Sequence, residues 1–223
     1  FIALTLPNKY SVTSLYEVNE VDTDTSMSML SGQLGSLGSL AGISLPGEST
    51  KSDFAVAFIK SKKMLRYLLV YEGMRENLYA PKSYDFETNT IIYDKKLFDS
   101  NKKEWIRKPK KNQKVIPSFQ EIYEEVISKQ LNVSVDRSSG FISISFTHVS
   151  PIFAKQFVEL LVVELNERTR INDLNESQQA IDFYNNKLED VSKIEIANSI
   201  NKLIEIELKK EMLSSVQKDY ILI

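Results

Sequence analysis

The spacing of hydrophobic and polar residues divides the chain into a mixed first part and a helical last third. Residues 7–22 alternate apolar and polar side chains and are rich in Tyr, Val and Thr, which predicts a strand. Residues 53–79 carry apolar side chains mostly at three- and four-residue spacing, which predicts helical structure. A further helix is predicted over residues 118–130, because Ser118 and Glu121 stand in the positions of a capping box.

Residues 131–148 predict a β-hairpin, in which two alternating segments flank the turn Ser138-Ser139-Gly140. Ser150 and Pro151 then form a helix start, and neither glycine nor proline follows as far as Ile223. Apolar residues recur there at helical spacing in two stripes, with a break around residues 192–195. We therefore predict two long antiparallel helices over residues 151–223.

Together these elements predict an α+β fold. Its base domain is a mixed α/β domain over residues 1–150, and residues 151–223 form a helical hairpin that returns to the base. The first helix of the hairpin would be roughly 60 Å long at about 1.5 Å per residue. Because a compact domain of this size does not need so long a helix, we expect the hairpin to protrude.

Two apolar segments are candidates for contacts between subunits. Five of the seven glycines lie between Gly32 and Gly47, where leucines are interleaved with them. Because leucines recur along it, we expect this segment to pack either against a neighbouring subunit or against another part of its own chain. The helix from Pro151 carries a second set of apolar positions, which a neighbour or the base would cover. The candidate contacts are Leu34, Leu37, Leu40, Val158 and Val162.

The beginning of the chain allows two interpretations. Phe1 to Leu6 read FIALTL, which fits either the outer end of a membrane helix or a buried first strand. No apolar run reaches the roughly 18 to 20 residues that cross a bilayer.

Composition and charge narrow the possible chemistry. The formal net charge is -2, and the basic run Lys102 to Lys114 contains one aromatic residue, so a solvated loop is favoured over a nucleic-acid site. The chain has no cysteine and only one histidine, His148, at a strand end. Carboxylates of the last third, such as Glu164, are assigned to solvated helix faces. We predict that the chain has no catalytic, cofactor-binding or metal-binding site and that the protein is not an enzyme.

A resemblance emerges from the order of the segments. Along the chain stand an apolar stretch leading into LPNKY, then GQLGSLGSLAGI, FAVAFIKSKKMLRYLL, EWIR, PSFQEIYEEV, SSGFISISFTHVSPIFAKQFVELLVVELNERTR and NKLIEIELKKEMLSSVQKDY. In this order the sequence resembles the chain length determinant (Wzz) family, the polysaccharide co-polymerases of bacterial inner membranes. The resemblance covers almost the whole chain and rests on the order of the segments rather than on any single motif.

The resemblance implies a periplasmic portion of an inner-membrane protein, with its base near the membrane and a membrane helix on each side. It implies a homo-oligomeric ring that sets the chain length of a lipid-linked surface polysaccharide, such as O-antigen, made by a separate polymerase. It implies no catalytic residues and no cofactor.

Three alternatives stay open beside this interpretation. A periplasmic adaptor or coiled-coil scaffold of an export system would share the hairpin. A capsule co-polymerase coupled to a cytoplasmic tyrosine kinase belongs to the same superfamily. A glycan hydrolase with two carboxylates represents a third class of function.

Overall fold

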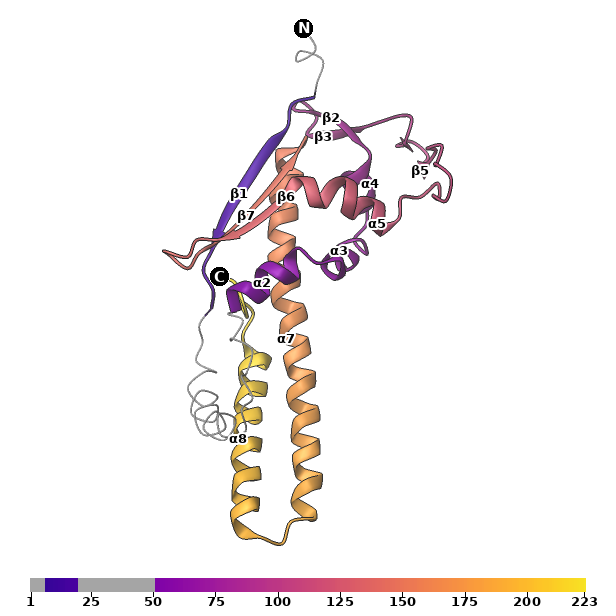
Figure 1. Ribbon diagram of the computed structural model, residues 1–223. Helices are drawn as coiled ribbons and strands as arrows, with labels where there is room; N and C mark the ends of the chain where they lie inside the picture. Colours follow the sequence, from indigo (N-terminus) through magenta and orange to yellow (C-terminus); the bar gives the residue numbers. More distant parts are fainter. Residues whose placement is uncertain (1–6, 20–50) are drawn as a thin grey trace. The chain divides into compact units, whose positions relative to one another are not determined.

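The structure, a computed structural model, describes residues 7–19 and 51–223 (Figure 1). About 52% of the described residues are helical and about 18% form strands, so the fold is mixed α+β, as predicted. The chain divides into two compact units: unit 1 contains residues 7–18 and 51–165, and unit 2 contains Asn19 and residues 166–223. The candidate contacts Leu34, Leu37 and Leu40 lie outside the described residues.

From the N-terminus onward the elements are β1 (Tyr10–Tyr16), α2 (Lys51–Ile59), α3 (Lys62–Leu68), α4 (Met74–Tyr79), β2 (Pro81–Asp85), β3 (Thr90–Tyr93), β4 (Phe98–Asp99), β5 (Glu104–Trp105), α5 (Phe119–Ile122), the π-helical turn η2 (Tyr123–Ile127), α6 (Ser128–Gln130), β6 (Leu131–Val135), β7 (Ile142–His148), α7 (Pro151–Glu189) and α8 (Ile194–Val216).

The core of unit 1 is built on a three-stranded antiparallel sheet with the order β1-β7-β6. Tyr10 lies opposite His148 in the register of β1 with β7, and Val135 of β6 lies opposite Ile142. Alternate residues of β7 are buried, which gives the sheet one buried face. The start of α7 covers that face, because the Phe157 ring lies 4.2 Å from the Phe146 ring, centroid to centroid.

The boundary between the two units falls later than the change of pattern in the sequence. The sequence places that change at residue 150, whereas unit 1 extends to Leu165. The physical reason is the apolar face of the first part of α7, which supplies buried residues to the core of unit 1: Phe153, Ala154, Phe157, Val158, Leu161, Val162 and Leu165. The first part of α7, which the sequence assigns to the hairpin, therefore belongs to unit 1.

The helical pattern of residues 53–79 corresponds to three short helices, α2, α3 and α4. Ser61 ends the first run, because its side chain accepts a hydrogen bond from the Met64 amide at 3.0 Å and so caps α3. Gly73 precedes α4 in the left-handed region, with φ at 73°, which a glycine adopts at low cost. Apolar spacing alone does not reveal such interruptions.

Four short strands lie between residues 81 and 105, where the hydrophobic pattern predicts neither a helix nor a strand. β2 pairs with β3 and β4 pairs with β5, each as a two-stranded antiparallel ribbon. Leu97 accepts a hydrogen bond from the Ile106 amide at 2.9 Å, which extends the second ribbon. These strands are too short to show a clear alternation of polar and apolar residues.

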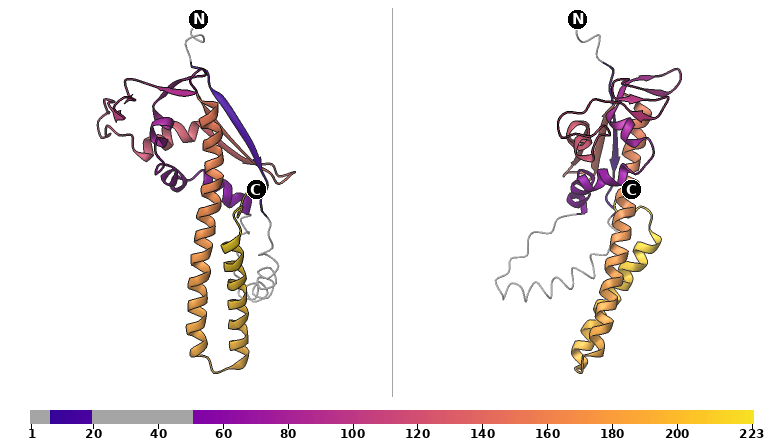
Figure 2. Two further views of the ribbon diagram at one scale, coloured as in Figure 1. Left: turned by 180° about the vertical axis from the view of Figure 1, so that it is seen from behind. Right: turned by 90° about the vertical axis from the view of Figure 1, so that its right-hand side faces the viewer.

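Unit 2 is the hairpin formed by the rest of α7 and by α8, which lie side by side in both views of Figure 2. The helices are linked by polar contacts as well as by packing. Arg170 donates to the Ser214 carbonyl at 3.1 Å, and Tyr220 donates to the Asp173 carboxylate at 2.6 Å. Asn166 holds the end of the chain, since its Oδ1 accepts hydrogen bonds from two consecutive backbone amides after α8.

Within the described ranges, no helix combines the length and the apolar character that crossing a bilayer requires.

Candidate functional site

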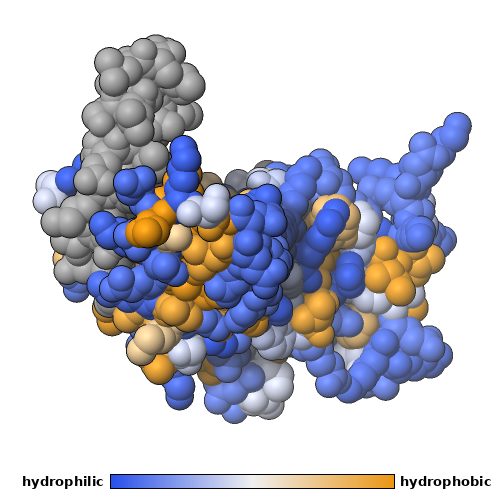
Figure 3. Space-filling view, turned by 90° about the horizontal axis from the view of Figure 1, so that it is seen from below, coloured by the Kyte–Doolittle hydropathy of each residue, from blue (hydrophilic) through white to orange (hydrophobic). Residues whose placement is uncertain are grey.

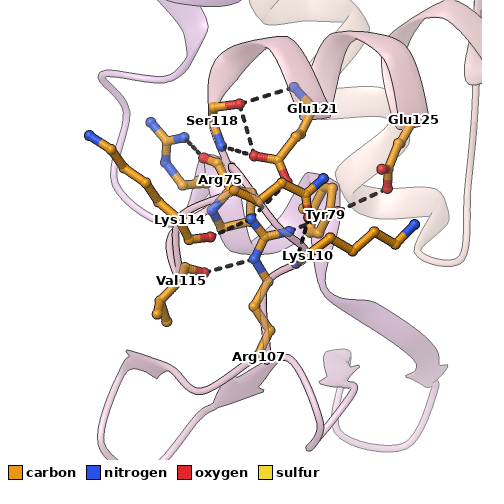
Figure 4. A network of polar contacts seen from close by, with 11 residues as sticks. Arg75, Tyr79, Arg107, Lys110, Lys114, Val115, Ser118, Glu121 and Glu125 are labelled. Atoms are coloured by element: carbon orange, nitrogen blue, oxygen red, sulfur yellow. Dashed lines mark hydrogen bonds and ion pairs between the residues drawn. The ribbon is translucent and has the colours of Figure 1, made fainter.

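Polar side chains of unit 1 converge on Arg107, which follows β5 (Figure 4). Its side chain is only 6% exposed and forms an ion pair with Glu121 at 2.7 Å. Its Nε and Nη2 atoms also donate to the carbonyl oxygens of Val115 and Lys114, at 2.8 and 2.6 Å. The guanidinium thereby ties the two ends of residues 108–114 together, and this segment is called the Arg107 loop below.

The partner of Arg107 is the capping-box glutamate of α5. One oxygen of Glu121 accepts hydrogen bonds from the amide and the hydroxyl of Ser118, both at 2.9 Å, and the other faces Arg107. Burial alone would raise the pKa of Glu121, but the bonds from Ser118 and Arg107 outweigh it and lower the pKa. The residue predicted as a helix cap therefore also anchors the buried arginine.

Tyr79, at the end of α4, joins this network to η2. Arg107 Nη1 lies 3.1 Å from the Tyr79 hydroxyl, which donates to Glu125 at 2.8 Å. Burial, followed by the hydrogen bond to Glu125 and its charge, raises the pKa of Tyr79 to about 12. The phenol stays protonated at neutral pH and so acts as the hydrogen-bond donor to Glu125.

A hollow of about 670 Å³ opens beside the network, entirely within unit 1. Tyr79, Arg107 and Glu125 contribute one part of its lining, and the turn before β4 contributes Lys96 and Leu97. The Arg107 loop and the residue before Arg107 contribute the rest, which includes two further lysines. This volume lies in the range of small-molecule sites.

The interpretation of residues 102–114 as a solvated loop is wrong for Arg107, which is buried, while the lysines of the segment are exposed. One signal in the sequence points to this difference. A single arginine stands among six lysines, and arginine is the cation that proteins use for buried, multiply hydrogen-bonded positions.

The other residues selected from the sequence lie away from the hollow. Val158 is fully buried and Val162 is 8% exposed within unit 1, so they offer little surface to a neighbouring subunit. Glu164 is 4% exposed and accepts a hydrogen bond from Tyr71 at 2.5 Å, so its assignment to a solvated face is wrong.

His148 is buried at the end of β7, and both of its ring nitrogens are bonded. Its Nδ1 accepts a hydrogen bond from the Ser150 amide at 3.1 Å, and this leaves Nε2 to donate to the Asn77 carbonyl at 2.8 Å. Burial lowers the pKa of the ring below its usual value. The residue ties β7 to α4 and to the start of α7 as a neutral imidazole.

In the described part of the chain, no group of three or more His, Cys, Asp or Glu residues is arranged to hold a metal ion. A comparison with protein-family models finds no match, and a comparison with curated proteins finds none either. The resemblance to the chain length determinants therefore rests on the order of the sequence segments.

Proposed function

We propose that this chain is the periplasmic portion of an inner-membrane chain length determinant, a non-catalytic scaffold. In this proposal, copies of the protein form a ring that regulates the length of a lipid-linked surface polysaccharide. A separate polymerase makes the polymer. The order of segments in the sequence supports the family, and the alternation of a mixed base with a long helical hairpin supports a scaffold.

The observation that carries the proposal is apolar surface on the hairpin that the hairpin does not bury itself. Leu208, Met212 and Val216 follow one another at four-residue spacing on α8 and are 44%, 69% and 78% exposed. Three more apolar residues on the two helices of unit 2 are well exposed, at 47% to 78%: Phe183, Ile194 and Ile196. In Figure 3, hydrophobic side chains reach the surface between hydrophilic ones.

Such a stripe favours contact with another hairpin. Single exposed apolar residues are ordinary, but a row along one helix is the pattern by which helices pair. Identical subunits that meet head to tail form a closed ring when the rotation between them closes. The exposed stripe of α8 takes the place of Val158 and Val162 as the candidate contact.

The test uses the full-length gene product in lipid, with the variant Leu208→Gln/Met212→Gln. Glutamine keeps the helix propensity and removes the apolar contact. We expect particle imaging to show rings of the unaltered protein, and we expect the double variant to weaken them and to broaden the polysaccharide length distribution in cells. The matched control, Val70→Gln/Val163→Gln, replaces two exposed apolar residues of unit 1, 74% and 58% exposed, and should change neither result.

Three outcomes would separate the alternatives. A protein that is monomeric in lipid contradicts the scaffold. A ring whose loss leaves polysaccharide length unchanged favours an adaptor of an export system, and shortening of the polymer by the purified protein favours a hydrolase.

A further inference from the structure

The hollow beside Arg107 concentrates positive charge that has no partner within the described residues. Lys96, Lys108 and Lys110 all line it. In the described ranges, no carboxylate lies within 4.0 Å of their amines, whereas Arg107 is neutralised by Glu121. Cations that share one concave site raise the local potential and attract an anion.

The backbone that carries these lysines is held in place before any ligand binds. Arg107 closes the loop from Lys108 to Lys114 through its two bonds to carbonyl oxygens. Within the loop, the Lys110 amide donates to the Gln113 side chain at 3.1 Å, and the Gln113 amide donates to the Lys110 carbonyl at 3.0 Å. The Lys96 amide donates to Asp94 at 2.8 Å. A site whose frame is already ordered loses less entropy when it binds a ligand.

The remaining lining suits a ligand that is more than a bare anion. Leu97 and Ile106 contribute apolar surface, and Ile106 is 48% exposed there. Gln113 and Glu125 add an amide and a carboxylate, which can bind hydroxyl groups. A sugar ring has apolar faces and a rim of hydroxyls, and the hollow is large enough for one or two such rings.

We infer that this hollow is a binding site for an anionic saccharide. The lysines bind the anionic group, the polar side chains bind the hydroxyls, and the apolar side chains contact the ring. The anionic group is a carboxylate, as in a uronic acid, or a phosphate, as in a sugar phosphate. The inference goes beyond the proposed function and does not depend on it, because it concerns unit 1 alone and needs no ring.

The experiment is a titration of the whole 223-residue chain, followed by the chemical shifts of its backbone amides. The probes are glucuronate, glucose 6-phosphate, glucose and inorganic phosphate at low ionic strength. We expect one or both anionic sugars to shift the amides of the Arg107 loop and to bind more tightly than glucose and phosphate. The preferred anionic sugar identifies the source of the charge.

Two double variants separate a built site from general attraction. Lys108→Ala/Lys110→Ala removes two amines of the hollow, and we expect it to weaken binding by at least about tenfold. Lys102→Ala/Lys111→Ala removes the same charge from the same basic segment but from positions that do not line the hollow, and it should leave binding nearly unchanged.

An equal loss in both double variants would overturn the inference, since it would reveal only general attraction to a basic surface. Binding of glucose as tightly as glucuronate and glucose 6-phosphate would also overturn it. So would binding of a nucleic acid without any binding of the single sugars. None of these results bears on whether the full-length protein forms rings.

Discussion

Replacing Glu121 by glutamine removes the charge that neutralises Arg107 while keeping an oxygen for Ser118. The pair is largely withdrawn from water, with exposures of 6% for the Arg107 side chain and 12% for that of Glu121. Loss of one partner of a buried ion pair costs about 3–5 kcal/mol, because the other charge stays buried without compensation. We expect Glu121→Gln to lower the free energy of unfolding of unit 1 by about 3 kcal/mol.

The second half of the experiment is Arg107→Met, which fills similar space without charge. It removes the ion pair and also the bonds to two carbonyl oxygens, so we expect a loss of about 3–5 kcal/mol. In the double variant no uncompensated charge is left. The two losses should therefore not add, and the double variant should be more stable than their sum predicts by about 2 kcal/mol.

Trp105 provides the assay, since it is the only tryptophan and it lies in unit 1. Its ring is 5.3 Å from that of Phe98 and 6.1 Å from that of Tyr79, centroid to centroid. Urea unfolding followed by its fluorescence reports on this region, whereas circular dichroism reports largely on the long helices. The reasoning would be refuted if the losses of unfolding free energy in Glu121→Gln and Arg107→Met added strictly in the double variant. It would also be refuted if each single variant lost less than about 0.5 kcal/mol. The control is Glu72→Gln, which breaks an exposed pair and should have no measurable effect.

Two further substitutions and one pH dependence test other parts of the fold. Phe157→Ala should destabilise unit 1 by about 3–5 kcal/mol, measured as a shift of the urea midpoint, because it empties a fully packed position. His148 has a lowered pKa in the folded state, so its neutral ring should contribute fully to the free energy of unfolding above pH 6.5. That contribution should be lost as the pH falls through the folded pKa, and urea midpoints measured across this range will show the loss. Asn166→Ala deprives the Ile221 and Leu222 amides of their acceptor, and hydrogen exchange at both amides should become faster.

Each of these three tests has a matched comparison. Phe183→Ala removes a phenyl ring that is 56% exposed and should cost much less than the loss of Phe157. His148→Gln should remove the pH dependence above the range in which carboxylates titrate. Asn175→Ala changes an exposed asparagine of the same helix and should leave exchange at the C-terminus as it was. If a comparison variant had the same effect as the test with which it is paired, the structural role assigned to Phe157, His148 or Asn166 in that pair would be contradicted.

The elements with a strong periodic pattern were predictable from the sequence. The capping box at Ser118 and Glu121, the hairpin of β6 and β7, and the helix start at Pro151 all stand where their residue types indicate. These signals are local, since a cap or a turn is determined by residues within a few positions of each other.

The candidate site was not predictable, because its parts become neighbours only through the fold. Arg107 meets the capping glutamate of a later helix and a tyrosine from an earlier one. The single arginine among the seven cations of the basic segment marks the residue suited to a buried position, but nothing in that segment indicates the partners against which it will be buried. The burial of Glu164 depends in the same way on Tyr71, which lies on a distant part of the chain.

The order of the strands in unit 1 also sets a condition on synthesis. β1 is made first, but its partner β7 is the last strand of the sheet to be made. At about 5–20 residues per second, the wait between them is on the order of ten seconds. During that time the backbone of β1 has no strand to pair with, and its alternating apolar side chains remain open to other extended chains. This exposure ends when β7 is made and pairs with β1.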